Sequence, residues 1–246
     1  MSTLIFDIET VGEEWGSFDV TTQSVLTRWI LRSSADALLR EAHLKDLKEG
    51  LGFSPLTGRI VAIGLYDLER ARGVVYFDSQ GTVTDDIEVG EYVFKSRTER
   101  EMLEDFWEGA KEYDTFVTFN GRVFDVPFLM LRSVAHDITP TRNLMAGRYL
   151  YQQRDIQHID LHDQLSFYGA VYRRQPLHLY CRAFGIESPK ASGVSGDDVA
   201  TLYVDGEYRA IAEYNARDVT ATKELYTKWK THLAAESMCP TDEVEQ

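Results

Sequence analysis

The chain has 246 residues, of which 43% are hydrophobic and 27% charged; this is typical of a folded globular protein and excludes wholesale disorder or a fibrous repeat. It contains no run of eighteen apolar residues and no basic segment ahead of its first apolar stretch, so we expect neither a membrane span nor a secretion signal and interpret the protein as cytoplasmic. The formal net charge of −14, taken for the chain as a whole, disfavours nucleic-acid binding, because phosphate recognition depends on Lys and Arg.

Short runs rich in apolar, β-branched and aromatic residues predict β-strands at residues 4–8, 59–66, 73–78 and 115–119. A short charged turn separates the second strand from the third, which indicates an antiparallel hairpin. Apolar residues at helical spacing predict a helix over residues 96–113, and the chain after Phe124 is expected to be mostly helical. This order favours the α/β class, with a mixed sheet covered by helices.

Residues 11–58 are too many for an ordinary connection between neighbouring strands. Their apolar residues recur at the spacing of one or two amphipathic helices, at Val25, Leu26, Trp29, Ile30, Leu38, Leu39, Ala42 and Leu47. We interpret the segment as a helical insertion after the first strand. One interpretation is a packing element or a cover for a sheet edge, and the other is a substrate lid or a dimer surface.

Two carboxylates lie at the end of the first predicted strand. Side chains alternate between the two faces of a strand, so Asp7 and Glu9 are expected on one face, about 7 Å apart, with Phe6 on the other. Like charges beside an apolar core destabilise a fold unless a cation or another partner neutralises them. The pair is therefore a candidate cation site.

Further carboxylates occur in two later helices. Asp125 is expected in the first turn of a helix, where the helix dipole favours a negative charge, so a capping role is the alternative to a functional one. Asp218 falls on the apolar stripe of the last helix, and Tyr214 precedes it by one i to i+4 step, which places phenol and carboxylate side by side. Such hard oxygen ligands suit Mg²⁺ or Mn²⁺, and a pair of these ions supports phosphodiester cleavage.

Three motifs in order carry a resemblance to a known family: residues 6–10 (FDIET), 120–129 (NGRVFDVPFL) and 214–218 (YNARD). They resemble the exonuclease motifs of the DEDD 3′-5′ exonuclease superfamily. The Tyr-x-x-x-Asp spacing is similar to the tyrosine subclass, since the histidine subclass carries His where Glu213 stands. Residues 158–161 (HIDL) and 190–196 (KASGVSG) resemble bacterial exonucleases related to the proofreading domain of family B DNA polymerases. The resemblance covers residues 1–10 and about 59–232, and the long insertion departs from it.

This resemblance implies an RNase H-like fold, with one exonuclease domain over residues 1–232. The composition of the last residues separately indicates an acidic tail, placed at 233–246. The resemblance also implies two Mg²⁺ or Mn²⁺ ions. By the resemblance, Asp7 bridges both ions, Glu9 and Asp218 complete the site of the ion that activates water, and Asp125 supports the second ion largely through water. Tyr214 would orient the attacking water or help to deprotonate it.

Contacts to the terminal nucleotide are expected from Phe6, Thr10, Asn120 and Phe124, with core packing an equal alternative for the two phenylalanines. Asp160 is interpreted as a helix cap or a minor substrate contact, in preference to a zinc site formed with His158, His162 and Asp163. Cys181 and Cys239 lack metal-site spacing and are expected to be free thiols.

Residues 122–190 differ from the rest of the chain in carrying nine basic and six acidic residues. Arginines and tyrosines alternate there, which suits single-stranded nucleic acid, although solvated arginines around core tyrosines are the alternative. The sequence thus predicts a metal-dependent 3′-5′ exonuclease that acts on single-stranded DNA ends and releases nucleoside 5′-monophosphates. Alternatives are the same reaction on RNA, a catalytically silent nucleic-acid-binding subunit, or an acidic interaction protein with calcium-stabilised loops. No membrane partner is expected, and a protein partner in DNA repair or replication stays open.

Overall fold

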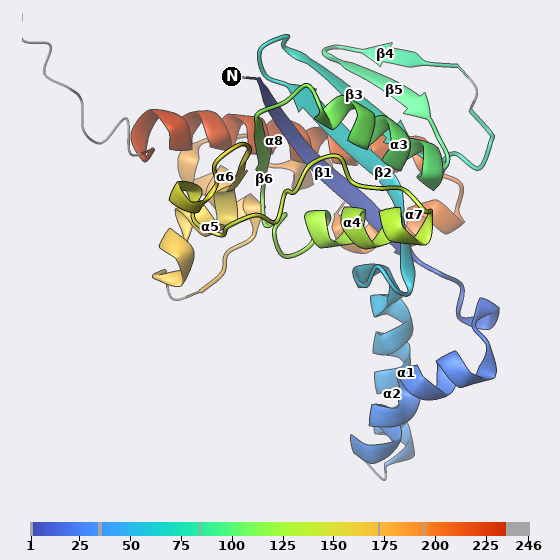
Figure 1. Cartoon of the computed structure of the whole chain (residues 1–246). Helices are drawn as coiled ribbons and strands as arrows, with labels where there is room; N and C mark the ends of the chain where they lie inside the picture. Colours follow the sequence, from blue (N-terminus) through green and yellow to red (C-terminus); the bar gives the residue numbers. More distant parts are fainter. Residues whose placement is uncertain (1, 34–35, 84, 172, 194, 235–246) are drawn as a thin grey trace, which may run out of the picture.

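The computed structural model describes residues 2–33, 36–83, 85–171, 173–193 and 195–234. Within these residues a seven-stranded mixed sheet has the order β4-β5-β3-β2-β1-β6-β7 (Figure 1). The strands are β1 (Thr3–Gly12), β2 (Gly58–Asp67), β3 (Arg72–Phe77), β4 (Ile87–Val89), β5 (Tyr92–Ser96), β6 (Thr115–Thr118) and β7 (Gln157–Asp160). The predicted mixed sheet is confirmed.

β1 occupies the middle of the sheet. It pairs with β2 in the antiparallel direction and with β6 in the parallel direction, and the predicted β2–β3 hairpin is antiparallel. β4, β5 and β7 were not predicted. β4 has only three residues, all exposed, and polar residues interrupt the apolar pattern of β7, so neither segment carries a strand signal.

Helices cover both faces of the sheet (Figure 1). They are α1 (Val20–Ser33), α2 (Ala37–Glu49), α3 (Glu99–Ala110), α4 (Asp125–Ala135), α5 (Leu161–Leu165), α6 (Leu177–Phe184), α7 (Val199–Val204) and α8 (Tyr208–His232). Short 3₁₀ turns occur at Trp15–Ser17, Gly50–Phe53, Leu150–Gln152, Phe167–Gly169, Pro189–Ser192 and Gly196–Asp198. The predicted helix over residues 96–113 is α3, which begins after a capping box formed by Thr98 and Glu101.

The two faces of β1 build separate parts of the core. Leu4, Phe6 and Ile8 pack toward α3 and α4, whereas Ile5 packs toward α8. This is the alternation expected from the sequence. It leaves Asp7 and Glu9 on the face that α8 covers.

The insertion forms an arm of α1 and α2 that projects from the end of β1 (Figure 1). The interpretation as an edge cover is wrong, because the arm extends away from the sheet. Its base is closely fitted: the hydroxyl of Thr10 donates to the carbonyl of Gly52 at 2.7 Å, and a Cβ on Gly52 would lie 2.9 Å from the nitrogen of Gly12. The arm is thus anchored at its base and free of the sheet elsewhere.

Among the described residues, no helix combines the length and apolar character needed to cross a membrane. Cys181 is a buried free thiol, and burial raises its pKa to about 11. Cys239 and most of the predicted acidic tail (235–246) lie outside the described residues.

Candidate active site

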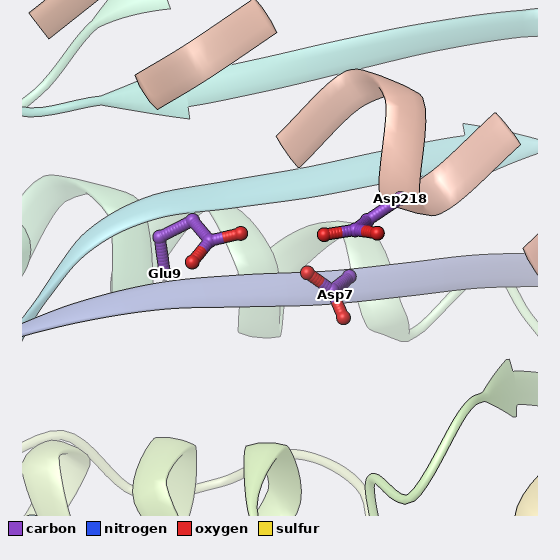
Figure 2. A group of neighbouring side chains, drawn as sticks. All are labelled: Asp7, Glu9 and Asp218. Atoms are coloured by element: carbon purple, nitrogen blue, oxygen red, sulfur yellow. The ribbon is translucent and has the colours of Figure 1, made fainter. Parts of the chain in front are cut away.

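Three carboxylates from β1 and α8 meet at one place. Asp7 and Glu9 project from β1, and Asp218 comes from the facing side of α8 (Figure 2). One carboxylate oxygen from each lies within 4.8 Å of those of the other two. β1 continues to Gly12, with a bulge between Glu9 and Thr10, so the acids lie inside the strand and not at its end as predicted.

The electrostatics of this cluster favour a bound cation. Burial raises the pKa of Asp7 well above its usual range, and the nearby charges of Asp125, Asp218 and Glu9 raise it further. Burial likewise raises the pKa of Glu9 well above its usual range, and that of Asp218 to about 6. Carboxylates this close together repel one another when ionised, and a bound cation would relieve the repulsion. Their oxygens are also the hard donors that Mg²⁺ and Mn²⁺ prefer, so these residues fit a divalent metal site.

Asp125 is the first residue of α4, as predicted, but its carboxylate does not cap that helix. Its Oδ1 accepts a hydrogen bond from the backbone nitrogen of Ile8 at 3.1 Å. β6 pairs with β1 only as far as Ile5, so the start of α4 takes the place of a strand beside Ile8. Burial raises the pKa of Asp125 to about 7, and its charge acts on Asp7.

Tyr214 is buried beside Asp218 on α8, one helical turn away as predicted. Burial, followed by the charges of Asp218 and Glu9, raises the pKa of the Tyr214 phenol far above its usual value. A hydrogen bond from the phenol to Asp218 opposes the rise in the pKa of Asp218 that burial causes. Tyr214 therefore carries its proton at neutral pH and acts as a hydrogen-bond donor.

A cleft of about 510 Å³ opens over Asp7, Asp218 and Tyr214. Its walls come from the residues directly after β6, from α5, from the start of α6 with the segment before it, and from the loop before α7. They consist of Phe119, Asn120, His162, Arg174, Gln175, Pro176, Leu177, His178, Pro189 and Lys190. Arg174 and Lys190 bring positive charge to a site that is otherwise acidic.

The residues predicted to contact a nucleotide are dispersed. Phe6 is fully buried against Phe106, with ring centroids 5.3 Å apart, so the core-packing interpretation describes it. The hydroxyl of Thr10 is bonded to the arm, and Phe124 packs partly buried in the core. Asn120 does line the cleft, with φ at 65°, a left-handed conformation that Asn tolerates.

Asp160 caps α5 by accepting from the backbone nitrogen of His162 at 2.9 Å. It also accepts from the backbone nitrogens of Asn120 at 2.8 Å and Arg122 at 3.0 Å. It thereby holds the turn between β6 and α4 that positions Asn120 and Asp125. The cap interpretation is supported.

The histidines near Asp160 do not form a metal group with it within the described part of the chain. His158 is buried between the hydroxyl of Thr118 and the carbonyl of Leu144. Burial lowers its pKa to about 4, so it is neutral at physiological pH. It serves as a core side chain.

Several arginines of residues 122–190 form ion pairs or hydrogen bonds within the fold. Arg148 forms a two-point ion pair with Asp163, and Arg132 does the same with Glu99. Arg142 donates to backbone carbonyls. These arginines thus have structural roles, which differ from both interpretations, nucleic-acid contact and solvated surface, while Arg174 and Lys190 line the cleft.

Asn215 and Gly64 were missed by the sequence interpretation. The amide of Asn215 donates to Oδ2 of Asp7 at 2.9 Å, and Gly64 is the partner of Asp7 on β2. The only signal available was that Asn215 lies inside the Tyr-x-x-x-Asp motif, three positions before Asp218.

A protein-family model described as "predicted 3′-5′ exonuclease related to the exonuclease domain of PolB" matches residues 59–242. The chain belongs to this family. The enzyme is accordingly a 3′-5′ exonuclease by class, and the matched residues include Asp125, Tyr214 and Asp218, whereas Asp7 and Glu9 precede them.

Curated relatives of this exonuclease include DNA polymerase 1 of Sulfurisphaera ohwakuensis, 26% identical over 138 residues, or 53% of this chain and 15% of the polymerase. DNA polymerase 1 of Saccharolobus solfataricus is 24% identical over 241 residues, 90% of this chain and 26% of the polymerase. The chain thus spans about a quarter or less of the length of these relatives.

The structure of the family B DNA polymerase of Pyrobaculum calidifontis is similar in fold, with a TM-score of 0.56 at 18% identity. The likeness covers 93% of this chain and 24% of the polymerase. It confirms the expected α/β, RNase H-like fold.

Proposed function

We propose that this exonuclease is metal-dependent and degrades single-stranded DNA from its 3′ end, releasing nucleoside 5′-monophosphates. The observation that carries the proposal is the meeting of Asp7, Glu9 and Asp218, whose carboxylate oxygens lie within 4.8 Å of one another beneath the cleft. DNA is preferred to RNA in the proposal because the curated relatives are DNA polymerases.

The proposed cofactor is a pair of Mg²⁺ or Mn²⁺ ions. Asp7, Glu9 and Asp218 would hold one ion, and Asp7 and Asp125 would support the second. Such ions generate a nucleophilic water at neutral pH and stabilise the leaving oxygen. The burial that raises the pKa of Asp7 and Glu9 supports this assignment, because a bound cation would offset the cost of burying their charges.

The remaining residues of the cleft would orient the substrate. Tyr214 keeps its proton, so we assign it the orienting of the attacking water and not its deprotonation. Arg174 and Lys190 would bind backbone phosphates. Phe119 and Leu177 offer apolar surface in the same cleft to the terminal base.

The test is the degradation of end-labelled single strands with Mg²⁺ or Mn²⁺, against the same mixture with chelator. A strand blocked at its 3′ terminus should resist, whereas one blocked at its 5′ terminus should be shortened. Asp218→Asn should abolish cleavage, and Glu224→Gln, an exposed acid on the same helix, should leave it unchanged.

Each alternative has its own outcome in this assay. Faster loss of an RNA strand of the same sequence would make the enzyme an exoribonuclease. Cleavage of circular strands as fast as linear ones would overturn the need for an end. No cleavage of either polymer with either metal would leave a nucleic-acid-binding subunit.

A further inference from the structure

Asn215 lies between the two functional residues of α8, and its side chain is fully buried. Its amide nitrogen donates to Oδ2 of Asp7, a residue 208 positions away, at 2.9 Å. The amide thus ties α8 to the central strand β1 at one of the clustered carboxylates.

The rest of the Asn215 side chain is not satisfied by the fold. Within the described residues, its Oδ1 is buried without a hydrogen-bond partner. A buried polar group left unpaired costs stability, so a side chain retained only for packing would be better replaced by an apolar one. The contact with Asp7 is therefore the feature that accounts for an amide at this position.

The opposite strand provides the space for this amide. Gly64 on β2 is the register partner of Asp7, and a Cβ built there would lie 2.2 Å from Oδ1 of Asn215 and 2.9 Å from Cγ2 of Val219. Its φ does not fall in the left-handed region, so backbone conformation does not require glycine here. Close approach of Asn215 does require it.

We propose that Asn215, for which Gly64 leaves room, is a positioning residue that fixes the side-chain orientation of Asp7 for metal binding. The inference rests on the proposed function, because it concerns the same metal site. It adds a residue from outside the carboxylate cluster that holds this ligand before the metal arrives. Side chains that orient metal ligands through hydrogen bonds typically contribute 10- to 100-fold in metal affinity or activity.

The first experiment compares Asn215→Leu, which keeps the side-chain size without the donor, with the unaltered enzyme. Calorimetric titration with Mn²⁺ alone should show affinity about 10- to 100-fold weaker. At saturating Mn²⁺, kcat should fall while KM for a single-stranded oligonucleotide stays the same. Thr220→Val, which removes a polar group from the same helix outside the site, is the matched control and should bind Mn²⁺ normally.

A second set of variants separates positioning from stability. Gly64→Ala should lower the melting temperature, because the new methyl group collides with Asn215. In Gly64→Ala with Asn215→Ala, the collision with Asn215 is removed and only the contact with Cγ2 of Val219 at 2.9 Å remains, so the melting temperature should recover in part, yet Mn²⁺ affinity should stay low. A double variant that binds Mn²⁺ within twofold of the unaltered enzyme would overturn the proposal.

Failure of the proposed function would be recognised separately. Mn²⁺ binding without hydrolysis of any strand would reject the exonuclease reaction, while the comparison of Mn²⁺ affinities would still decide the role of Asn215. Normal Mn²⁺ affinity in Asn215→Leu together with normal cleavage would reject Asn215 as a positioning residue and keep the exonuclease.

Discussion

Tyr214 holds a protonated phenol against Asp218, which makes it a donor at the edge of the carboxylate cluster. We predict that Tyr214→Phe lowers turnover by roughly 10- to 10⁴-fold, the range expected when one group that positions a proton-transferring water is lost. Mn²⁺ affinity and KM should be preserved. Single-turnover rates and calorimetry measure the two effects, and unaltered turnover would reject the role in orienting water.

Asp218 also makes stability depend on pH. Burial raises its pKa to about 6 in the folded protein, against 3.8 for the ordinary group. As pH rises from about 4 to above 6, the folded protein without metal therefore loses stability relative to a variant that cannot ionise there. Asp218→Asn should melt higher than the unaltered protein at pH 7.5, and the difference should shrink at pH 5.

Thermal unfolding in chelator at the two pH values measures this difference. The same difference at pH 5 and pH 7.5 would show that the carboxylate is not destabilised by burial. The comparison with the variant is needed because buried His158, with its pKa lowered to about 4, makes the protein less stable as pH falls.

At the level of single residues, the sequence predicted side chains whose spacing reports their face. Asp7 and Glu9 share a face by strand alternation, and Tyr214 and Asp218 by helical periodicity. Asn215 and Gly64 could not be predicted in this way. Their contact joins α8 to β2 through tertiary packing, for which neither residue carries a local pattern.

Among the elements, the helices α1 and α2 of the arm contribute little to the core. Within the helices of the arm, Ile30 of α1 is buried, and no residue of α2 is. At the base of the arm, the two ends of the insertion contact each other, since the ammonium of Lys48 lies 5.4 Å from the centre of the Trp15 ring. We predict that replacing residues 16–47 by a short Gly/Ser linker changes the melting temperature by no more than about 4 °C, the shift that about 1 kcal/mol produces in a protein of this size.

Circular dichroism during heating tests this, with hydrolysis of a short strand as the second measurement. Retained folding with normal cleavage would assign the arm a role outside the catalytic domain. Failure of the shortened protein to fold would show that the arm is a packing element. Intact folding with lost cleavage would support a substrate lid.

The elements that were predicted are those with a full apolar face. β1, β2 and β3 are runs rich in apolar and β-branched residues, and α3 carries its apolar residues at helical spacing. β4 and β7 were missed because each depends on a neighbouring strand: three exposed residues pair with β5, and β7 adds four residues beside β6. A strand that short is stabilised by its partner more than by its own sequence.

For the molecule as a whole, the charge of −14 is compatible with a nucleic-acid substrate only if binding depends on a few local cations. We predict that Arg174→Ala and Lys190→Ala each raise KM for long single strands and reduce the slope of log affinity against log salt by about one. Filter binding from low to high salt, in chelator, measures the slope. Arg182→Ala, exposed on α6 and absent from the cleft lining, is the control.

An unchanged slope in both cleft variants would show that the strand does not pass Arg174 and Lys190. The tyrosines and arginines of residues 122–190 would then have no role in substrate binding. Arg132 and Arg148 already form ion pairs within the fold, with Glu99 and Asp163.

The carboxylate cluster joins two parts of the chain that are synthesised far apart in time. β1 is made before its neighbours β2 and β6, and Asp218 follows only with α8, the last of the described helices. Contacts between such distant segments slow folding, because the intervening chain must be ordered before they form. A nascent chain that stalls before α8 therefore lacks Asp218, one of the proposed metal ligands, so we expect a partly synthesised chain to be unable to cleave the proposed nucleic-acid substrate.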